Sequence, residues 1–344
     1  MIVYNFADIN DYEKFPYREI ETDSTKFIFP KAVNPKVPKA FTTKDSVTSS
    51  FEDFLKENKT VAFLIVRNDS IYYENYFDGY LEESIVPSFS MAKSVLSILI
   101  GAAIEDGYIG AVSDPVTKYV PEMKEEGFDK ISIENLLQMT SGIEFSESYW
   151  NPFGDAAAFY YGKNILKKTK RLDIETAPGN QFDYSSGSAQ LLGTVLHNAL
   201  PKEISISDYL EKKLWKPLGM KFNATWSLDE KNGMEKTFCC LNARAIDYAK
   251  IGRLYLHDGN WNGTQIVPKS WVKTSTKIDT TNGSSKFYQY QWWLPTDSGD
   301  FAAKGILGQF IYVNPTKNLI IVRLGKNYGE VDWMEVFVAL AAHY

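Results

Sequence analysis

The sequence has few of the residues that bind metals or form disulfides. Its 344 residues include three histidines and two cysteines, and the cysteines, Cys239 and Cys240, are adjacent. The histidines lie far apart and lack the HExxH spacing of zinc enzymes. Adjacent cysteines suit neither a CxxC metal site nor an ordinary disulfide framework. We therefore expect no metal site, and we interpret the cysteines as two buried small side chains.

The chain also lacks an excess of positive charge and any long apolar run. Its formal net charge is −6, whereas nucleic-acid binding needs a basic surface that displaces counterions. No stretch reaches the roughly 18 apolar residues of a membrane helix, and the first residues lack the basic and apolar regions of a signal peptide. We expect no nucleic-acid partner and no transmembrane segment. The compartment stays open between the cytoplasm and export with a removed leader.

Aromatic residues, in contrast, are plentiful. The sequence contains 21 Tyr, 21 Phe and 8 Trp, together 15% of the chain. A chain of this length and composition can bury a large core, which excludes disorder as its main state. At about 150 residues per domain, the length predicts two domains or one large domain with an insertion.

The two ends of the chain carry the strand patterns. Residues 61–66 are almost all apolar, as in a strand covered on both faces, and turn residues separate them from a second run at 71–76, which predicts a hairpin. Three further strand-like runs lie at residues 287–294, 308–313 and 319–324.

Helical patterns fill much of the remaining sequence. We expect a buried helix at residues 89–105 that ends near Gly107, because glycine commonly terminates helices. Further helical patterns lie at residues 132–138, 153–161, 185–200, 205–215, 241–257 and 331–342. We expect no strand between residues 110 and 230.

This order of elements predicts an α+β fold. An antiparallel sheet built from both ends of the chain would be flanked by helices, with an all-helical lobe inserted between its halves. Residues 1–57 are expected to form an irregular N-terminal segment, and residues 58–344 a single two-lobed domain. Its α/β lobe would comprise about 58–109 plus 232–344, and its helical lobe about 110–231.

One short motif, Ser90-Met-Ala-Lys93, lies at the start of the predicted buried helix. Residues three apart on a helix lie about 5–6 Å from each other on one face, so the lysine amine can reach the serine hydroxyl. A serine hydroxyl needs a base to become a nucleophile, and burial fits a lysine for that task by lowering its pKa. Taken alone, the motif more often marks a helix-capping serine followed by a surface lysine.

Two further motifs follow along the chain. Tyr184-Ser-Ser186 precedes a predicted helix; its tyrosine is either a second acid/base, if a nearby cation lowers its pKa, or a core aromatic. The segment Lys-Gly-Ile-Leu-Gly-Gln at 304–309 is predicted to open a strand. Its glycines mark either close approach of a ligand or a β-bulge.

The combination of these motifs, in this order, resembles the serine β-lactamase and penicillin-binding superfamily. The resemblance is closest to its class C-like branch, which includes class C β-lactamases, D-Ala-D-Ala carboxypeptidases, family VIII esterases and 6-aminohexanoate-dimer hydrolase. Three further segments, at residues 136–142, 178–185 and 242–252, also resemble sequences of this superfamily. The resemblance runs from about residue 58 to the end. It implies the β-lactamase/transpeptidase-like fold.

The resemblance also implies a role for individual residues. Ser90 would be the acylated nucleophile and Lys93 its general base. Tyr184 would relay a proton to the leaving group, and the backbone N–H groups of Ser90 and Ile306 would form an oxyanion hole. No cofactor is implied.

Two departures from the family's pattern bear on the substrate. Ser186 stands where the lactamases and peptidases usually have asparagine, and Ala303 and Lys304 replace the first two residues of their Lys-Thr-Gly motif. Both departures weaken the case for penicillin or D-Ala-D-Ala substrates. The Gly-Ile-x-Gly-Gln form is similar to that of 6-aminohexanoate-dimer hydrolase, which cleaves amides and esters.

Six residues are candidates for substrate binding. For the aromatic ones, core packing is an equally open interpretation. The candidates are Tyr149, Trp150, Ser186, Gly305, Gly308 and Gln309.

The leading hypothesis is a serine hydrolase that acts on a small-molecule or short peptide-like ester or amide through an acyl-serine. Two alternatives stay open. One is a D,D-carboxypeptidase or weak β-lactamase, and the other is a non-catalytic descendant of the fold that only binds a ligand. The oligomeric state cannot be predicted from the sequence.

Overall fold

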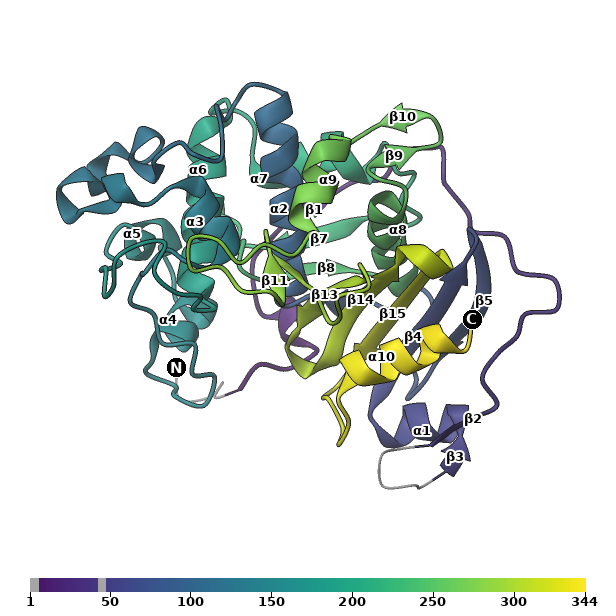
Figure 1. Ribbon diagram of the computed structural model, residues 1–344. Helices are drawn as coiled ribbons and strands as arrows, with labels where there is room; N and C mark the ends of the chain where they lie inside the picture. Colours follow the sequence, from purple (N-terminus) through teal and green to yellow (C-terminus); the bar gives the residue numbers. More distant parts are fainter. Residues whose placement is uncertain (1–5, 43–47) are drawn as a thin grey trace.

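An antiparallel sheet of strands from both ends of the chain forms the centre of the molecule (Figure 1). The structure is a computed structural model that describes residues 6–42 and 48–344. Within these residues, seven antiparallel strands follow the order β11-β12-β13-β14-β15-β4-β5. Their bounds are β4 Thr60–Arg67, β5 Ser70–Tyr76, β11 Tyr288–Gln289, β12 Trp292–Trp293, β13 Phe301–Gly305, β14 Gln309–Asn314 and β15 Leu319–Gly325.

The β4 strand shows why an almost continuous apolar run forms a central strand. Phe63 and Ile65 face one hydrophobic core, whereas Leu64 and Val66 face the other, and all four side chains are buried. Successive side chains of a strand point to opposite faces, so a strand between two cores needs apolar residues at every position. The predicted hairpin and the predicted covering of both faces are confirmed.

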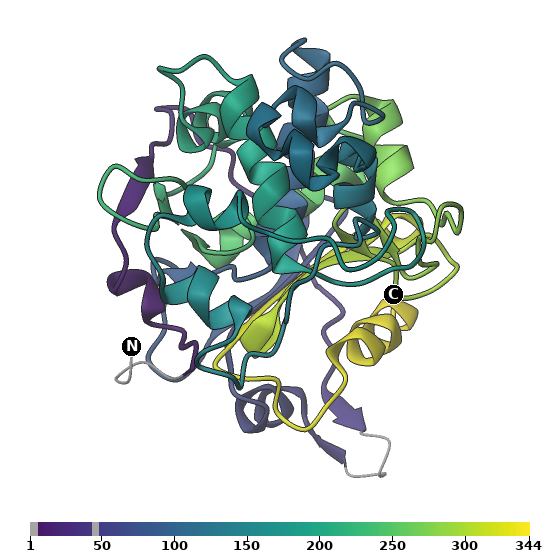
Figure 2. The same ribbon diagram turned by 90° about the vertical axis from the view of Figure 1, so that its left-hand side faces the viewer.

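Helices cover both faces of this sheet. Helices α2 (Met91–Glu105) and α8 (Ala245–Leu256) pack into the core on one face, and α1 (Phe51–Glu57) and α10 (Trp333–Ala342) into the core on the other. Figure 2 shows the yellow C-terminal helix on the side of the sheet opposite the teal helices. No helix in the described parts of the chain is both long and apolar enough to cross a membrane.

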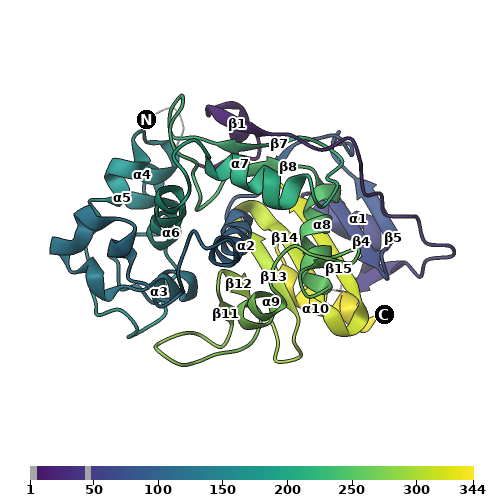
Figure 3. The same cartoon turned by 90° about the horizontal axis from the view of Figure 1, so that it is seen from above.

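Short helices form a group beside α2 (Figure 3). The predicted helices near residues 132–138, 153–161 and 185–200 are confirmed, and Ser132 and Asn135 form a complete capping box at the first of them. The lobe boundaries themselves stay a prediction. The elements are η2 Val116–Lys118, η3 Pro121–Glu126, η4 Phe128–Lys130, α3 Ile133–Gln138, α4 Asp155–Tyr161, α5 Ile165–Thr169, α6 Ser186–Ala199, α7 Ile206–Leu210 and the π-helical turn η5 Glu211–Trp215, with α9 Lys269–Ser275 further along the chain.

A second, smaller sheet corrects three expectations. Its order is β1-β7-β8-β6, and β1 (Tyr17–Ile20) pairs with β7 (Ala224–Ser227) across some two hundred residues. Residues 1–57 are therefore not simply irregular, residues 110–230 do contain a strand, and β8 (Leu241–Ala243) occupies the start of the helix predicted at 241–257. These strands are short and pair with remote segments, so no local periodicity predicts them.

The remaining elements are short. They are η1 Asp11–Glu13, β2 Ala40–Thr42, β3 Thr48–Ser50, β6 Val86–Pro87, β9 Asn260–Trp261, β10 Thr264–Gln265, η6 Ile306–Gly308 and η7 Pro315–Lys317.

Candidate active site

The candidate site begins at the N-terminal end of α2, where Ser90 is the N-cap residue. The preceding Phe89 is buried and has a φ of 44°. A bulky residue in the left-handed region is strained, and such strain persists where the surrounding structure fixes the backbone. The tight turn sets Ser90 at the helix entrance, where backbone N–H groups point toward an incoming anion.

Lys93 lies one turn into the same helix and is buried, with 1% of its surface exposed. Its Nζ atom is 3.0 Å from Ser90 Oγ, 3.1 Å from Ser186 Oγ and 2.9 Å from the carbonyl oxygen of Phe238. Burial lowers the pKa of Lys93 to about 8, although the charge of Glu147 opposes the shift. The lysine can therefore carry a neutral amine close to neutral pH, which is the form that accepts a proton.

Tyr184 lies directly before α6, whose N-cap is Ser185. Lys93 Nζ lies 4.9 Å from the centroid of the Tyr184 ring, and the ring also packs against Trp293 at 5.6 Å. Burial, with the charge of Glu147 adding to it, raises the pKa of Tyr184, while a side-chain hydrogen bond with Ser90 works against the rise. The condition set for a second acid/base, a tyrosine pKa lowered by a nearby cation, is therefore not met, and this hydroxyl keeps its proton at neutral pH.

The segment at residues 304–309, which contains two glycines, joins two strands rather than opening one. Gly305 ends β13, Ile306 begins the turn η6, and Gln309 starts β14, which corrects the predicted position. A Cβ atom on Gly305 would meet the carbonyl oxygen of Ser88 and would lie 3.2 Å from the nitrogen of Ser90. The glycine thus allows the end of β13 to lie against the backbone at the start of α2.

Two predicted substrate-binding residues have structural contacts instead. The buried Gln309 amide donates to the Gly325 carbonyl oxygen at 2.7 Å and accepts from the Gly325 N–H at 3.0 Å. A Cβ on Gly308, whose φ is 82°, would clash with the guanidinium of Arg323. Both residues hold the turn η6 against the neighbouring strand β15. Their side-chain positions face the sheet rather than Ser90.

Glu147 completes the site, and the sequence analysis did not find it. Its two carboxylate oxygens accept from the Ser186 N–H at 2.8 Å and from Ser186 Oγ at 2.6 Å. The same carboxylate accepts a hydrogen bond from the Tyr149 hydroxyl. Hydrogen bonds therefore link Ser90, Lys93, Ser186, Glu147 and Tyr149 in a continuous chain.

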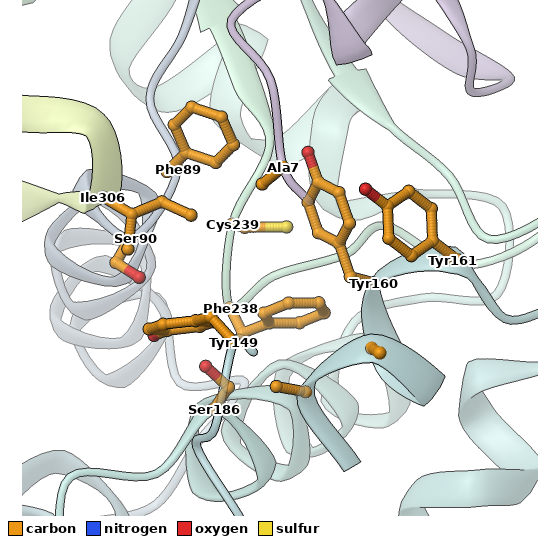
Figure 4. Close-up of a pocket in the computed structure, with 12 residues that line it drawn as sticks. Ala7, Phe89, Ser90, Tyr149, Tyr160, Tyr161, Ser186, Phe238, Cys239 and Ile306 are labelled. Carbon is orange, nitrogen blue, oxygen red and sulfur yellow. The ribbon is translucent and has the colours of Figure 1, made fainter. Parts of the chain in front are cut away.

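A pocket opens beside Ser90 (Figure 4). Its cavity volume is about 50 Å³. Tyr149 lines it, as predicted, but Trp150 does not: its side chain is 80% exposed and packs against Phe6 at 5.4 Å. The lining residues are Ala7, Phe89, Ser90, Tyr149, Ala156, Ala157, Tyr160, Tyr161, Ser186, Phe238, Cys239 and Ile306.

The two cysteines lie next to this pocket and are joined to each other. Both are buried, as expected, but a disulfide links Cys239 to Cys240, which corrects the interpretation of two separate side chains. Cys240 has a φ of 73°. The disulfide follows directly after Phe238, whose carbonyl oxygen accepts a hydrogen bond from Lys93.

Comparison with known proteins defines the family. The family model described as Beta-lactamase matches residues 48–332. The chain therefore belongs to the beta-lactamase family, as its motifs suggested. An acyl-serine mechanism is characteristic of this family.

Among curated proteins, the chain is similar to the 6-aminohexanoate-dimer hydrolase of Paenarthrobacter ureafaciens. The two are 27% identical over 296 residues, which cover 79% of this chain and 74% of the relative.

Solved structures confirm the predicted fold. The Bacillus anthracis structure named "Putative 6-aminohexanoate-dimer hydrolase" superimposes with a TM-score of 0.85 at 24% identity, covering 99% of this chain and 93% of the other. A family VIII carboxylesterase superimposes with a TM-score of 0.65 at 15% identity, covering 85% and 95%. The architecture is thus β-lactamase/transpeptidase-like: a sheet with flanking helices and a group of helices beside it.

Proposed function

We propose that the protein is a serine hydrolase that cleaves an ester or amide bond through an acyl intermediate on Ser90. The observation that carries the proposal is the position of Lys93. Its buried amine lies 3.0 Å from Ser90 Oγ and has its pKa lowered by burial to about 8. A base must lie within hydrogen-bonding reach of the proton that it removes and must have a pKa near the working pH, and Lys93 meets both conditions.

The first half of the reaction uses groups on three elements. The neutral Lys93 amine takes the Ser90 proton while Oγ attacks the substrate carbonyl carbon. The N–H groups of Ser90 and Ile306 donate to the oxygen that becomes negative in the tetrahedral intermediate. As the intermediate collapses, Tyr184 gives its proton to the leaving oxygen or nitrogen and regains one from the Lys93 ammonium.

The second half returns the enzyme to its starting state. Water attacks the acyl carbon while the neutral Lys93 amine takes its proton, as it took that of Ser90. The acyl–oxygen bond breaks, Ser90 regains its proton, and a carboxylic acid leaves. Protons and electron pairs balance without a redox partner.

The departures from the lactamase pattern favour esters and linear amides over penicillins. Ala303 is buried and offers no cation, and the Nζ of Lys304 lies 5.2 Å from the centroid of the Trp293 ring. Ser186 is hydrogen-bonded to Glu147 and Lys93. The Paenarthrobacter relative, named for an amide dimer of an unbranched amino acid, supports the same preference.

The test combines labelling with turnover. A fluorophosphonate probe should label the wild type and Ser97→Ala, but not Ser90→Ala, and p-nitrophenyl butyrate should be hydrolysed by the same two forms only. Ser97 is the matched control because it is buried in the same helix and its hydroxyl makes no hydrogen bond within the described residues.

Three results would contradict the proposal. Absence of both labelling and turnover in the wild type would favour a non-catalytic binder. Labelling by fluorescent penicillin without ester turnover would favour a D,D-carboxypeptidase. Equal labelling of Ser90→Ala would place the nucleophile elsewhere.

A further inference from the structure

We propose that residues 6–15, here called the wall segment, form the far end of the pocket and set the length of the aliphatic group that binds beside the scissile bond. The inference rests on the proposed function, since it concerns the substrate of the same site. It assigns a role to a segment that precedes the residues matched by the beta-lactamase family model.

The wall segment contributes Ala7 to the pocket lining, beside Tyr160. Ser90, Ile306 and Ser186 lie at one end, and Tyr160 and Tyr161 lie at the other (Figure 4). None of the lining residues carries an ionised side chain at neutral pH. A pocket without charge, with aromatic and alanine walls, favours an uncharged aliphatic group over a polar or ionic one.

Asp11 anchors the wall segment to the pocket. Its carboxylate is fully buried, with one oxygen 3.0 Å from the Tyr160 hydroxyl that donates to it. The other oxygen accepts from Lys14 at 2.6 Å, and the Asp8 N–H donates back to the carboxylate at 3.0 Å. A buried carboxylate is costly unless it is paired and hydrogen-bonded, and here these contacts tie the segment's own turn to helix α4.

Aromatic contacts hold the same segment from a second direction. The Phe15 ring packs edge-to-face on Tyr160 at 5.2 Å. The buried Lys236 places Nζ 3.2 Å from the Phe15 ring centroid and donates to the Tyr160 carbonyl oxygen at 2.5 Å. Phe15 and Asp11 hold the later part of the segment, and the hydrogen bond from the Asp8 N–H to the Asp11 carboxylate holds the backbone next to Ala7, so that backbone is not free to yield to a longer substrate.

Ala7 is the residue that this anchoring brings to the pocket. It is half-buried and lines the cavity together with Ala156 and Ala157 of α4. Three alanines in the lining leave space that a larger side chain would fill. Since one methylene in a fitted apolar pocket changes specificity by about 10- to 200-fold, the volume at Ala7 should decide which chain lengths are accepted.

The test measures kcat/KM for p-nitrophenyl acetate, butyrate and octanoate. Ala7→Phe should lower the ratio of octanoate to acetate at least about 10-fold relative to wild type, in line with the loss of one to two methylene positions. Ala157→Leu, at a lining residue of α4, should act in the same direction. Ala32→Phe, a half-buried alanine that contacts β5 outside the pocket, should leave the ratio unchanged.

A purely structural segment would give a different pattern. An equal fall for all three esters, or an unchanged ratio in both Ala7→Phe and Ala157→Leu with wild-type melting temperatures, would overturn the inference.

Binding separates this inference from the proposed function, because it needs no turnover. In a Ser90→Ala background, hexanamide should bind in calorimetric titration and lose affinity at least about 10-fold when Ala7→Phe is added. If the wild type has no esterase activity but this loss of affinity is observed, the proposed function is wrong and the inferred role of the wall segment stands. If esters are hydrolysed but Ala7→Phe leaves hexanamide binding unchanged, the inferred role of the wall segment is wrong and the proposed function stands.

Discussion

Lys93 faces Ser90 with its Nζ atom 3.0 Å from the serine Oγ, and two acceptors lie on its other sides. Glu147 Oε1 accepts a hydrogen bond from the Ser186 hydroxyl at an oxygen–oxygen distance of 2.6 Å, so Ser186 Oγ is left to accept from Lys93. The Phe238 carbonyl oxygen accepts a second N–H of the lysine. As an ammonium, Lys93 donates to all three oxygens. The neutral amine has two N–H groups, and when these stay on Ser186 and Phe238 its lone pair faces Ser90.

The first prediction concerns pH. Below its pKa Lys93 is an ammonium and cannot take the Ser90 proton; above it the amine is neutral. Because burial lowers that pKa to about 8, kcat/KM for p-nitrophenyl butyrate should rise with pH and reach half its maximum near pH 8. The measurement is a pH–rate profile at constant ionic strength. A flat profile, or one that falls through this range, would remove Lys93 as the base.

The second prediction concerns Glu147. Its negative charge favours the ammonium form and so raises the pKa of Lys93. Glu147→Gln removes the charge but keeps an oxygen that can accept from Ser186, so the midpoint of the pH–rate profile should move to lower pH. Glu144→Gln, at an exposed position of the same segment, is the control and should leave the midpoint in place. An upward or absent shift in Glu147→Gln would show that this carboxylate acts on packing alone.

The third prediction isolates one backbone N–H group. Ile306 is the first residue of a 3-10 turn, and Gly305 before it is extended, so proline fits this position with little strain. Ile306→Pro removes the N–H and should lower kcat about 100- to 1,000-fold, which corresponds to about 2.7–4 kcal/mol. Ile306→Ala keeps the N–H and reports the side chain separately. Equal effects of the two substitutions would refute an oxyanion contact from this nitrogen.

The fourth prediction concerns the tyrosine hydroxyl. Tyr184→Phe should slow the first turnover of N-butyryl-p-nitroanilide in a stopped-flow experiment by about 100-fold or more, because the leaving amide nitrogen loses its proton donor. Tyr288→Phe is the matched control, since that buried ring lies 5.9 Å from Tyr184. A first-turnover rate in Tyr184→Phe equal to that of the control would show that the Tyr184 ring only packs.

Short-range patterns account for what the sequence could predict. Ser90 and Lys93 share a helix face because they are three residues apart, and the apolar run in β4 required a strand covered on both sides. The strand β13 (Phe301–Gly305) was not predicted, because Phe-Ala-Ala-Lys-Gly has no β-branched residue and no alternation.

Long-range contacts account for what it could not predict. Glu147 reaches Ser186 across 39 residues from a segment outside the regular elements, and no motif marks it. Asp11 reaches Tyr160 across 149 residues. The burial of Asp11 could not be inferred from the sequence, because aspartate is mostly a surface residue in proteins. Such contacts become visible only when the fold brings the segments together.

The central claim is that Ser90 carries an acyl group during turnover, and acid quenching followed by peptide mass spectrometry tests it most directly. With p-nitrophenyl butyrate in the steady state, the peptide that contains Ser90 should gain the mass of one butyryl group in the wild type and none in Ser90→Ala. Turnover with no acylated peptide, or a butyryl group on any other residue, would contradict the account.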